Sequence, residues 1–272
     1  MATPSPAERP WALVTGASAG IGDAFARELA ARGHALVLVA RRRERLDALA
    51  SELATAHGVQ TLVVVADLAR PEAPREILEA TTRAGVHVDV LVNNAGYGVP
   101  GSFLSPPWEH HRDFIQVLMT AACELCQLYL PAMRARGWGT IINVASLAGI
   151  MPGSAGHTLY AASKAFAIRF SQSLALENQS HGVQVTAVCP GFTYSEFHDV
   201  TGARALVSRM PGWMWMQAAD VARQGLDAAA RGKIVFVPGR VNRVMAFIGK
   251  HLPDRLAMTL MKRQSKRFRV SD

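Results

Sequence analysis

Tyr160 and Lys164 are the two residues of this chain whose types and spacing best suit acid–base chemistry. A free tyrosine has a pKa of about 10 and a free lysine about 10.4, so neither exchanges protons readily at neutral pH. Residues four apart on a helix share one face, so the ammonium of Lys164 can stabilise a Tyr160 phenolate and lower the pKa of the phenol. An ordinary helical Tyr/Lys pair has the same spacing, and the surrounding elements must decide between the two interpretations.

Seven apolar runs predict the strands of an α/β fold. The chain has 272 residues, of which 50% are hydrophobic, and this is enough for one large domain. The runs are continuously apolar and are separated by segments long enough for crossover helices, which is typical of parallel strands covered on both faces. We therefore expect a single-domain doubly wound parallel sheet, the Rossmann fold, with ligands at the carboxyl ends of its strands. The expected strands are Trp11–Thr15, Ala35–Ala40, Leu62–Ala66, Val90–Asn93, Thr140–Val144, Gln184–Cys189 and Lys233–Val237.

A glycine-rich turn follows the first expected strand and opens a helix that continues through Phe25 and Leu29. Its three glycines let the backbone approach a pyrophosphate, and the free N–H groups of the helix N-terminus attract the negative charge. A tight turn without a ligand is the alternative, and the flanking strand and helix favour the binding site. The predicted contacts in this turn are Gly16, Ser18, Ala19, Gly20, Ile21 and Gly22.

Three arginines, Arg41 to Arg43, follow the second expected strand, where an acidic residue would bind an adenosine ribose. Because guanidinium groups suit a ribose 2′-phosphate, we expect NADPH to be preferred over NADH. Arg41 is the first candidate and Arg42 the second, whereas Arg43 and Arg45 fit the solvated start of a helix. A solvated helix start also explains any single one of these arginines.

Small and polar residues follow the next two expected strands at the same edge. Asp67 and Leu68 come after the third strand, where a short side chain can meet an adenine amino group. Asn94, Ala95 and Gly96 come after the fourth. Turn chemistry alone favours such residues, and their common location is what indicates a cofactor site.

With these motifs assembled, the chain resembles the short-chain dehydrogenase/reductase family from about Trp11 to Val237. Five features occur in the family's order and at compatible distances: Thr15-Gly16-x-x-x-Gly20-Ile21-Gly22, Asn93-Asn94-Ala95-Gly96, Ser146, Tyr160-x-x-x-Lys164 and Pro190-Gly191. The resemblance implies a nicotinamide-dependent oxidoreductase that assembles as a homodimer or homotetramer.

The resemblance also implies a role for each matching residue. Tyr160 would exchange a proton with the substrate oxygen, Ser146 would hydrogen-bond that oxygen, and hydride would pass between the nicotinamide and the carbonyl carbon. Lys164 would bind the nicotinamide ribose as well as lower the pKa of the tyrosine. Ser195, after Pro190-Gly191, would help to hold the carboxamide.

Two features depart from the family pattern. Leu118 stands where many members have an asparagine that helps to retain a water linking the lysine to solvent, so either a backbone carbonyl or a displaced polar group such as Gln116 must replace it. An NADPH-binding sensor or scaffold with little catalysis is the alternative function that Leu118 raises. The loop Gly149–Leu159 is one residue longer than the commonest spacing, and its His157 is either exposed or a substrate contact.

Methionine and tryptophan are concentrated in the segment Met210–Met216. Such side chains form an adaptable apolar wall, which favours a hydrophobic, lipid-like or aromatic carbonyl or alcohol substrate. Packing of this segment on the core or on a partner subunit is an equally good interpretation.

Positive charge gathers at the C-terminus. Residues 240–272 contain nine basic and two acidic residues, a net charge of +7 out of a total of +8. Apolar residues at helical spacing on both sides of Pro253 accompany this charge, so an amphipathic helix can lie on an anionic membrane or cover a lipid-accepting pocket. A solvated helix packed on its own domain is the alternative. The apolar residues are Val244, Met245, Phe247, Ile248, Leu252, Leu256, Leu260 and Met261.

These observations predict a flexible leader at 1–10, a main domain at 11–239 with a substrate cover around 192–216, and a basic extension at 240–272. No secretory leader or apolar run of about 18 residues stands out, so we expect a cytoplasmic protein, peripheral to a membrane if the extension binds one. No nucleic-acid-binding module accompanies the charge, and no nucleic-acid partner is expected. Cys123, Cys126 and Cys189 fit core thiols better than a metal or redox site, so no metal is expected.

Overall fold

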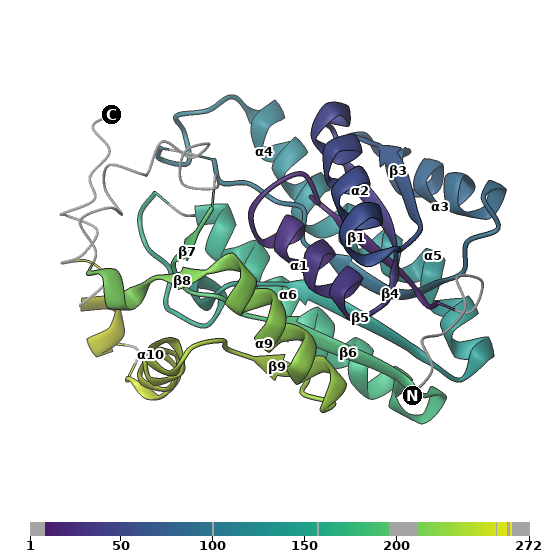
Figure 1. Ribbon diagram of the computed structural model, residues 1–272. Coiled ribbons are helices and arrows are strands. Elements are labelled where there is room, and N and C mark those ends of the chain that lie inside the picture. Colours follow the sequence, from purple (N-terminus) through teal and green to yellow (C-terminus); the bar gives the residue numbers. More distant parts are fainter. Residues whose placement is uncertain are drawn as a thin grey trace.

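Seven parallel strands form the centre of the molecule in the order β3-β2-β1-β4-β5-β6-β9 (Figure 1). The structure is a computed structural model that describes residues 9–99, 101–156, 158–195, 211–253, 255–259 and 262. The strands are β1 (Trp11–Thr15), β2 (Ala35–Ala40), β3 (Thr61–Val65), β4 (Val88–Asn93), β5 (Gly139–Val144), β6 (Val183–Val188) and β9 (Val235–Phe236). The doubly wound parallel sheet expected from the apolar runs is confirmed.

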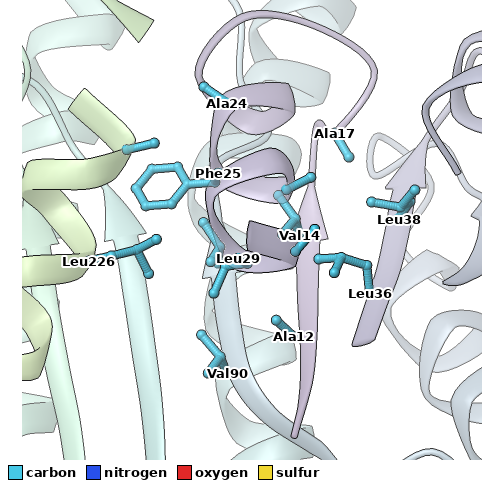
Figure 2. Packing of buried hydrophobic residues seen from close by; sticks show 14 of the residues in the cluster. Ala12, Val14, Ala17, Ala24, Phe25, Leu29, Leu36, Leu38, Val90 and Leu226 are labelled. Atoms are coloured by element: carbon cyan, nitrogen blue, oxygen red, sulfur yellow. The ribbon is translucent and has the colours of Figure 1, made fainter. Parts of the chain in front are cut away.

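Alternate residues of each strand face opposite layers of helices, because side-chain direction reverses at every residue of a strand. On one face, Ala12 and Val14 of β1 pack with Phe25 and Leu29 of α1 and with Leu226 of α9 (Figure 2). This layer consists of α1 (Gly20–Ala31), α2 (Arg43–His57) and α9 (Ala218–Ala230). Covering both faces requires continuously apolar strands, and this is why the strands lack polar alternation.

The opposite face is covered by α3 (Ala73–Arg83), α4 (Trp108–Ile115), α5 (Ala121–Arg136) and α6 (Thr158–Asn178). A π-helical turn, η2 (Gln116–Thr120), joins α4 to α5 and makes one continuous helix. By length and composition this helix, Trp108–Arg136, could cross a membrane, a stretch that the sequence patterns did not single out. Its residues Phe114, Leu125 and Met133 are buried against the sheet, as in a core helix.

Shorter elements and one further helix lie around this sheet. They are the 3₁₀ turns η3 (Leu147–Gly149), η4 (Gln179–His181) and η5 (Gly212–Met214), the two-stranded sheet β7 (Thr193–Tyr194) and β8 (Met216–Gln217), and α10 (Arg240–His251). The helix α10 ends just before Pro253, which cannot continue a helix, and residues 255–259 and 262 are helical again. Most of the leader, His157, Met210, Leu260 and Met261 lie outside the described residues.

The topology decides which residues meet. In a parallel sheet all carboxyl ends lie at one edge, and β1 is flanked by β2 and β4, whose neighbour is β5. The segments after these four strands therefore gather at one edge although they are far apart in the sequence. They contain the glycine-rich turn, the arginines, Asn94 and Ser146.

Candidate active site

Ser146 and Tyr160 are brought together by η3 and the first turn of α6. Ser146 follows β5, and its Oγ accepts a hydrogen bond from the N–H of Ala148 at 3.1 Å, which caps η3. The Ser146 hydroxyl lies 3.5 Å from the Pro190 carbonyl oxygen, and it is near enough to the hydroxyl of Tyr160 to lower the pKa of that phenol. Both residues keep some exposed surface.

Lys164 lies one turn further along α6 and is only 8% exposed. Its Nζ donates a hydrogen bond of 2.7 Å to the carbonyl oxygen of Val144 and lies 5.7 Å from the centre of the Tyr160 ring. Burial lowers the pKa of Lys164 to about 8, although the neighbouring Cys189 acts in the opposite direction. The amine can therefore exchange protons close to neutral pH.

The pKa of Tyr160 differs from the expectation. Burial raises the pKa of this phenol, and the neighbouring Ser146 hydroxyl only partly offsets that effect. The expected lowering by Lys164 is not seen, because the ammonium is directed at the Val144 carbonyl and is itself weakened by burial. In this state Tyr160 is a protonated phenol, which suits a proton donor.

The spacing between Ser146 and Lys164 depends on Gly149. A Cβ atom at this position would lie 2.5 Å from the carbonyl carbon of Lys164 and 2.6 Å from the nitrogen of Ala165. Both are backbone atoms of α6 that cannot move aside. Only glycine lets η3 approach α6 this closely, and the longer loop leaves this contact intact.

The glycine-rich turn has the form of a phosphate cradle. Gly16 and Gly20 have φ angles of +68° and +60°, which favour glycine. A Cβ atom at Gly22 would lie 2.2 Å from the Gly16 oxygen, so the turn can press against α1 only without side chains. Ala19 caps α1 with no side-chain hydrogen bond, which leaves the N-terminal N–H groups to a ligand. These residues fit the pyrophosphate of a dinucleotide.

A hydrogen-bonded clamp joins the ends of β1 and β4. The Asn94 side chain donates to the Thr15 carbonyl at 2.9 Å, and Thr15 Oγ1 accepts from the backbone N–H groups of Asn94 and Ala95 at 3.0 and 3.1 Å. The role of Thr15 was missed by sequence reasoning, although a polar residue closing an apolar strand was a signal. Gly96 lies against Leu118, which is 3.4 Å from the position of a Cβ atom there.

The two candidate arginines take different positions. Arg42 donates to Ser18 Oγ from Nε at 3.2 Å and from Nη2 at 3.0 Å, so its guanidinium lies beside the glycine-rich turn. Arg41 is 72% exposed at its side chain and lies 3.9 Å from Asp67. Leu68, the neighbour of Asp67, is buried in the core, so only its backbone could meet an adenine.

The segment after β6 lies against both the turn and the serine. The Pro190 carbonyl accepts from the N–H of Leu147 at 2.8 Å, and a Cβ atom at Gly20 would lie 3.0 Å from that of Ser195. Gly191 leaves room for the buried Asn242 of α10, whose Nδ2 donates to the Pro238 carbonyl at 2.9 Å. The structural role of Asn242 has no signal in the sequence.

A cavity with both apolar and polar residues in its lining borders Tyr160. Its lining includes Phe103, His111, Phe114 and Leu159, none of which the sequence patterns identified. The side chains of the apolar wall predicted in Met210–Met216 do not share one environment. Trp215 stacks on Tyr194 with ring centres 4.8 Å apart and Met216 packs on the core, whereas Trp213 is 67% exposed.

The cysteines are free thiols. Burial raises the pKa values of Cys123 and Cys126, and that of Cys189 to about 12. Such thiols are weak nucleophiles and weak metal ligands at neutral pH.

A doubly wound sheet with this phosphate turn and a Ser–Tyr–Lys set at the same edge is the arrangement of a dinucleotide-dependent oxidoreductase. The family model for short chain dehydrogenase matches residues 10–204. The chain belongs to the short-chain dehydrogenase family, whose members act on CH–OH or C=O groups with a nicotinamide cofactor.

Known proteins of this family match this chain over most of its length. A very-long-chain 3-oxoacyl-CoA reductase of Anas platyrhynchos is 33% identical over 264 residues, which are 96% of this chain and 81% of the relative. The structure of a 7beta-hydroxysteroid dehydrogenase superposes with a TM-score of 0.83 at 27% identity, covering 93% of this chain and 96% of that one. A short-chain dehydrogenase from Sphingobium yanoikuyae in complex with NADPH has a TM-score of 0.78 at 32% identity and covers 97% of both chains.

The lowered pKa of Lys164 predicts a pH dependence of stability. Between about pH 8 and 10.4 the unfolded chain keeps this proton while the folded protein has lost it, so folding gains stability as pH rises. The free energy of unfolding of the wild type, minus that of Lys164→Met, should rise by about 3 kcal/mol across this window. Urea unfolding at several pH values would measure it, and a difference independent of pH would contradict the depressed pKa.

Proposed function

We propose that this protein is an NADP(H)-dependent reductase that interconverts a ketone or aldehyde and an alcohol on a hydrophobic, lipid-like or aromatic substrate. The observation that carries the proposal is the pair of neighbouring Ser146 and Tyr160 hydroxyls, with Lys164 one turn away and the phosphate cradle at the same edge.

The residues of this chain supply the proton and the electrostatic stabilisation. Tyr160 donates its proton to the carbonyl oxygen while Ser146 donates a hydrogen bond to it, which stabilises the developing alkoxide. Burial keeps the phenol protonated before the reaction. Once the phenolate forms, the nearby Lys164 ammonium stabilises it. The nicotinamide cofactor, when bound, supplies or accepts the hydride.

Two observations support NADP(H) over NAD(H). Arg42 lies on Ser18 beside the phosphate turn, and the exposed Arg41 is adjacent to it at the end of β2. Two guanidinium groups there suit a 2′-phosphate, whereas a ribose hydroxyl is bound by a carboxylate. The relative from Sphingobium yanoikuyae that binds NADPH is 32% identical to this chain.

The substrate class follows from the cavity beside Tyr160. Phe103, Phe114 and Leu159 contribute apolar side chains to its lining, beside the polar Ser102, His111 and Thr158. We infer from the apolar side chains that an acyl chain or a fused ring is favoured over a small charged acid. The printed names of the relatives, a very-long-chain 3-oxoacyl-CoA reductase and a 7beta-hydroxysteroid dehydrogenase, point to substrates of the same character. The sensor or scaffold alternative has no support in these comparisons.

A membrane surface is a second partner that one observation favours. Val244, Phe247 and Ile248 lie three and four residues apart on α10 and are 59%, 65% and 52% exposed. Arg240, Arg243 and Lys250 lie on the same helix. Apolar side chains with basic neighbours complement an anionic lipid surface, so we propose a cytoplasmic homodimer or homotetramer that contacts such a surface peripherally.

The Tyr160→Phe variant tests the catalytic assignment. It removes only the acidic hydroxyl, so turnover of long-chain and aromatic ketones should fall by at least about 100-fold while NADPH binds as before. NADPH absorbance and fluorescence titration measure the two effects. Tyr129→Phe is the matched control, because its hydroxyl bonds Thr81 within the core. Unchanged turnover in Tyr160→Phe would contradict the assignment of Tyr160 as the proton donor.

Arg41→Ala and Arg42→Ala test the cofactor preference. Each removes a cation at the expected 2′-phosphate position, so the Kd for NADPH should rise roughly 10-fold while that for NADH stays nearly constant. Arg45→Ala is a control on the exposed start of α2. An equal loss of both cofactors would contradict a 2′-phosphate contact.

The membrane proposal predicts that the full-length protein sediments with vesicles containing phosphatidylserine and that removal of residues 240–272 abolishes this. Phe247→Ser should weaken binding in the intact chain, because it removes exposed apolar area from α10. Leu176→Ser, at a 71% exposed position on α6, is the control. Full-length protein that never sediments with such vesicles rules the contact out.

A further inference from the structure

A small cavity inside the fold borders Lys164. It has a volume of about 20 Å³, enough for one water molecule where polar partners are present. Asn93 of β4, Asn143 of β5 and Leu118 of η2 also line it. Gln116 is not part of this wall, and its Nε2 is buried without a hydrogen-bond partner among the described residues, so Gln116 is not the substitute for the missing asparagine.

A chain of hydrogen bonds determines how the Asn93 amide is oriented. Ser171 donates its only hydroxyl proton to the Ala167 carbonyl at 2.7 Å, so Ser171 Oγ must accept from Asn143 Nδ2 at 2.9 Å. The Oδ1 atom of Asn143 is thereby directed at Asn93 and accepts from its Nδ2 at 2.9 Å. The oxygen of Asn93 is consequently the free end of the chain.

That oxygen lacks any partner among the described residues. Asn93 is 7% exposed, and its Oδ1 is buried without a hydrogen bond. An unsatisfied buried acceptor costs about 1–3 kcal/mol, and bound water is the usual remedy. Lys164 borders the same cavity, and with one N–H directed at Val144 its ammonium has two further donors.

We propose that Asn93 Oδ1 holds a water molecule in this cavity and that this water exchanges protons with Lys164. The inference rests on the proposed function. Each reduction removes one proton from Tyr160, and one must return from solvent. As Lys164 gives up a proton toward Tyr160, the bound water donates one to the resulting amine and regains one from solvent, so protons and charge balance. Asn93 is a positioning residue, because its Oδ1 accepts a hydrogen bond from the water and the apolar side chain of Leu118 cannot.

The Asn93→Ala variant tests the proposal in kinetics. Loss of the water should lower kcat about 10-fold and increase the solvent deuterium isotope effect on kcat, while the Kd for NADPH is unchanged. The control Cys126→Ala truncates a buried side chain that also contacts Asn93 Nδ2, and it should leave both kinetic quantities at the wild-type value.

A second substitution separates water positioning from structural damage. Leu118→Asn places an amide on the same cavity wall, and in the Asn93→Ala background it should restore most of the lost kcat and the normal isotope effect. Structural damage from the broken hydrogen-bond chain would not be rescued, because Leu118 takes no part in it. Lack of rescue, or a wild-type kcat in Asn93→Ala, overturns the proposal.

Direct observation of the water keeps this test independent of any substrate. A high-resolution crystal structure should show a water within hydrogen-bond distance of Asn93 Oδ1 and Lys164 Nζ, and an empty cavity would overturn the inference. An active Tyr160→Phe enzyme would contradict the proposed function without contradicting the water site. A failure of the proposed function can therefore be distinguished from a failure of this inference.

Discussion

The ammonium of Lys164 lies inside the fold and is hydrogen-bonded to the Val144 carbonyl at the end of β5. A buried charge must find polar partners, and here they are a strand-end carbonyl and the nearby phenol, with Asn93 and Asn143 on the wall of the adjoining small cavity. The same burial that depresses the pKa of Lys164 raises that of Tyr160. Desolvation disfavours the charged form of each group. The pKa of Lys164 therefore lies below that of Tyr160, whereas a free lysine has the higher pKa of the two.

Close backbone contacts hold this arrangement in place. Gly149 lets η3 approach α6, which sets Ser146 against Tyr160, and Gly22 lets α1 approach the phosphate turn. The hydrogen bonds of Asn94 and Thr15 then tie the turn to β4. Because these contacts join elements that meet only at the carboxyl edge of the sheet, the cofactor cradle and the acid–base set form one site.

Much of the fold could be predicted from the sequence. The apolar runs located β1 and β2 to the residue, and β3 lay one residue earlier than expected. The last strand, expected at Lys233–Val237, is shorter because only Val235 and Phe236 pair with β6. Apolarity marks what can be buried, whereas pairing with a neighbouring strand decides where a strand ends.

The sequence by itself determined the sheet, the glycine-rich turn and the Tyr160/Lys164 pair, because local spacing and residue type suffice for these, whereas Ser146 was identified through the family resemblance. Only the tertiary structure decided that Lys164 is directed at Val144, that the pKa of Tyr160 is raised, and that Gln116 lies away from the cavity. It also revealed that Asn93 Oδ1 is a buried acceptor with no hydrogen-bond partner among the residues that the structure describes. Desolvation and hydrogen-bond partners arise from residues distant in the chain, and a sequence pattern contains no measure of either.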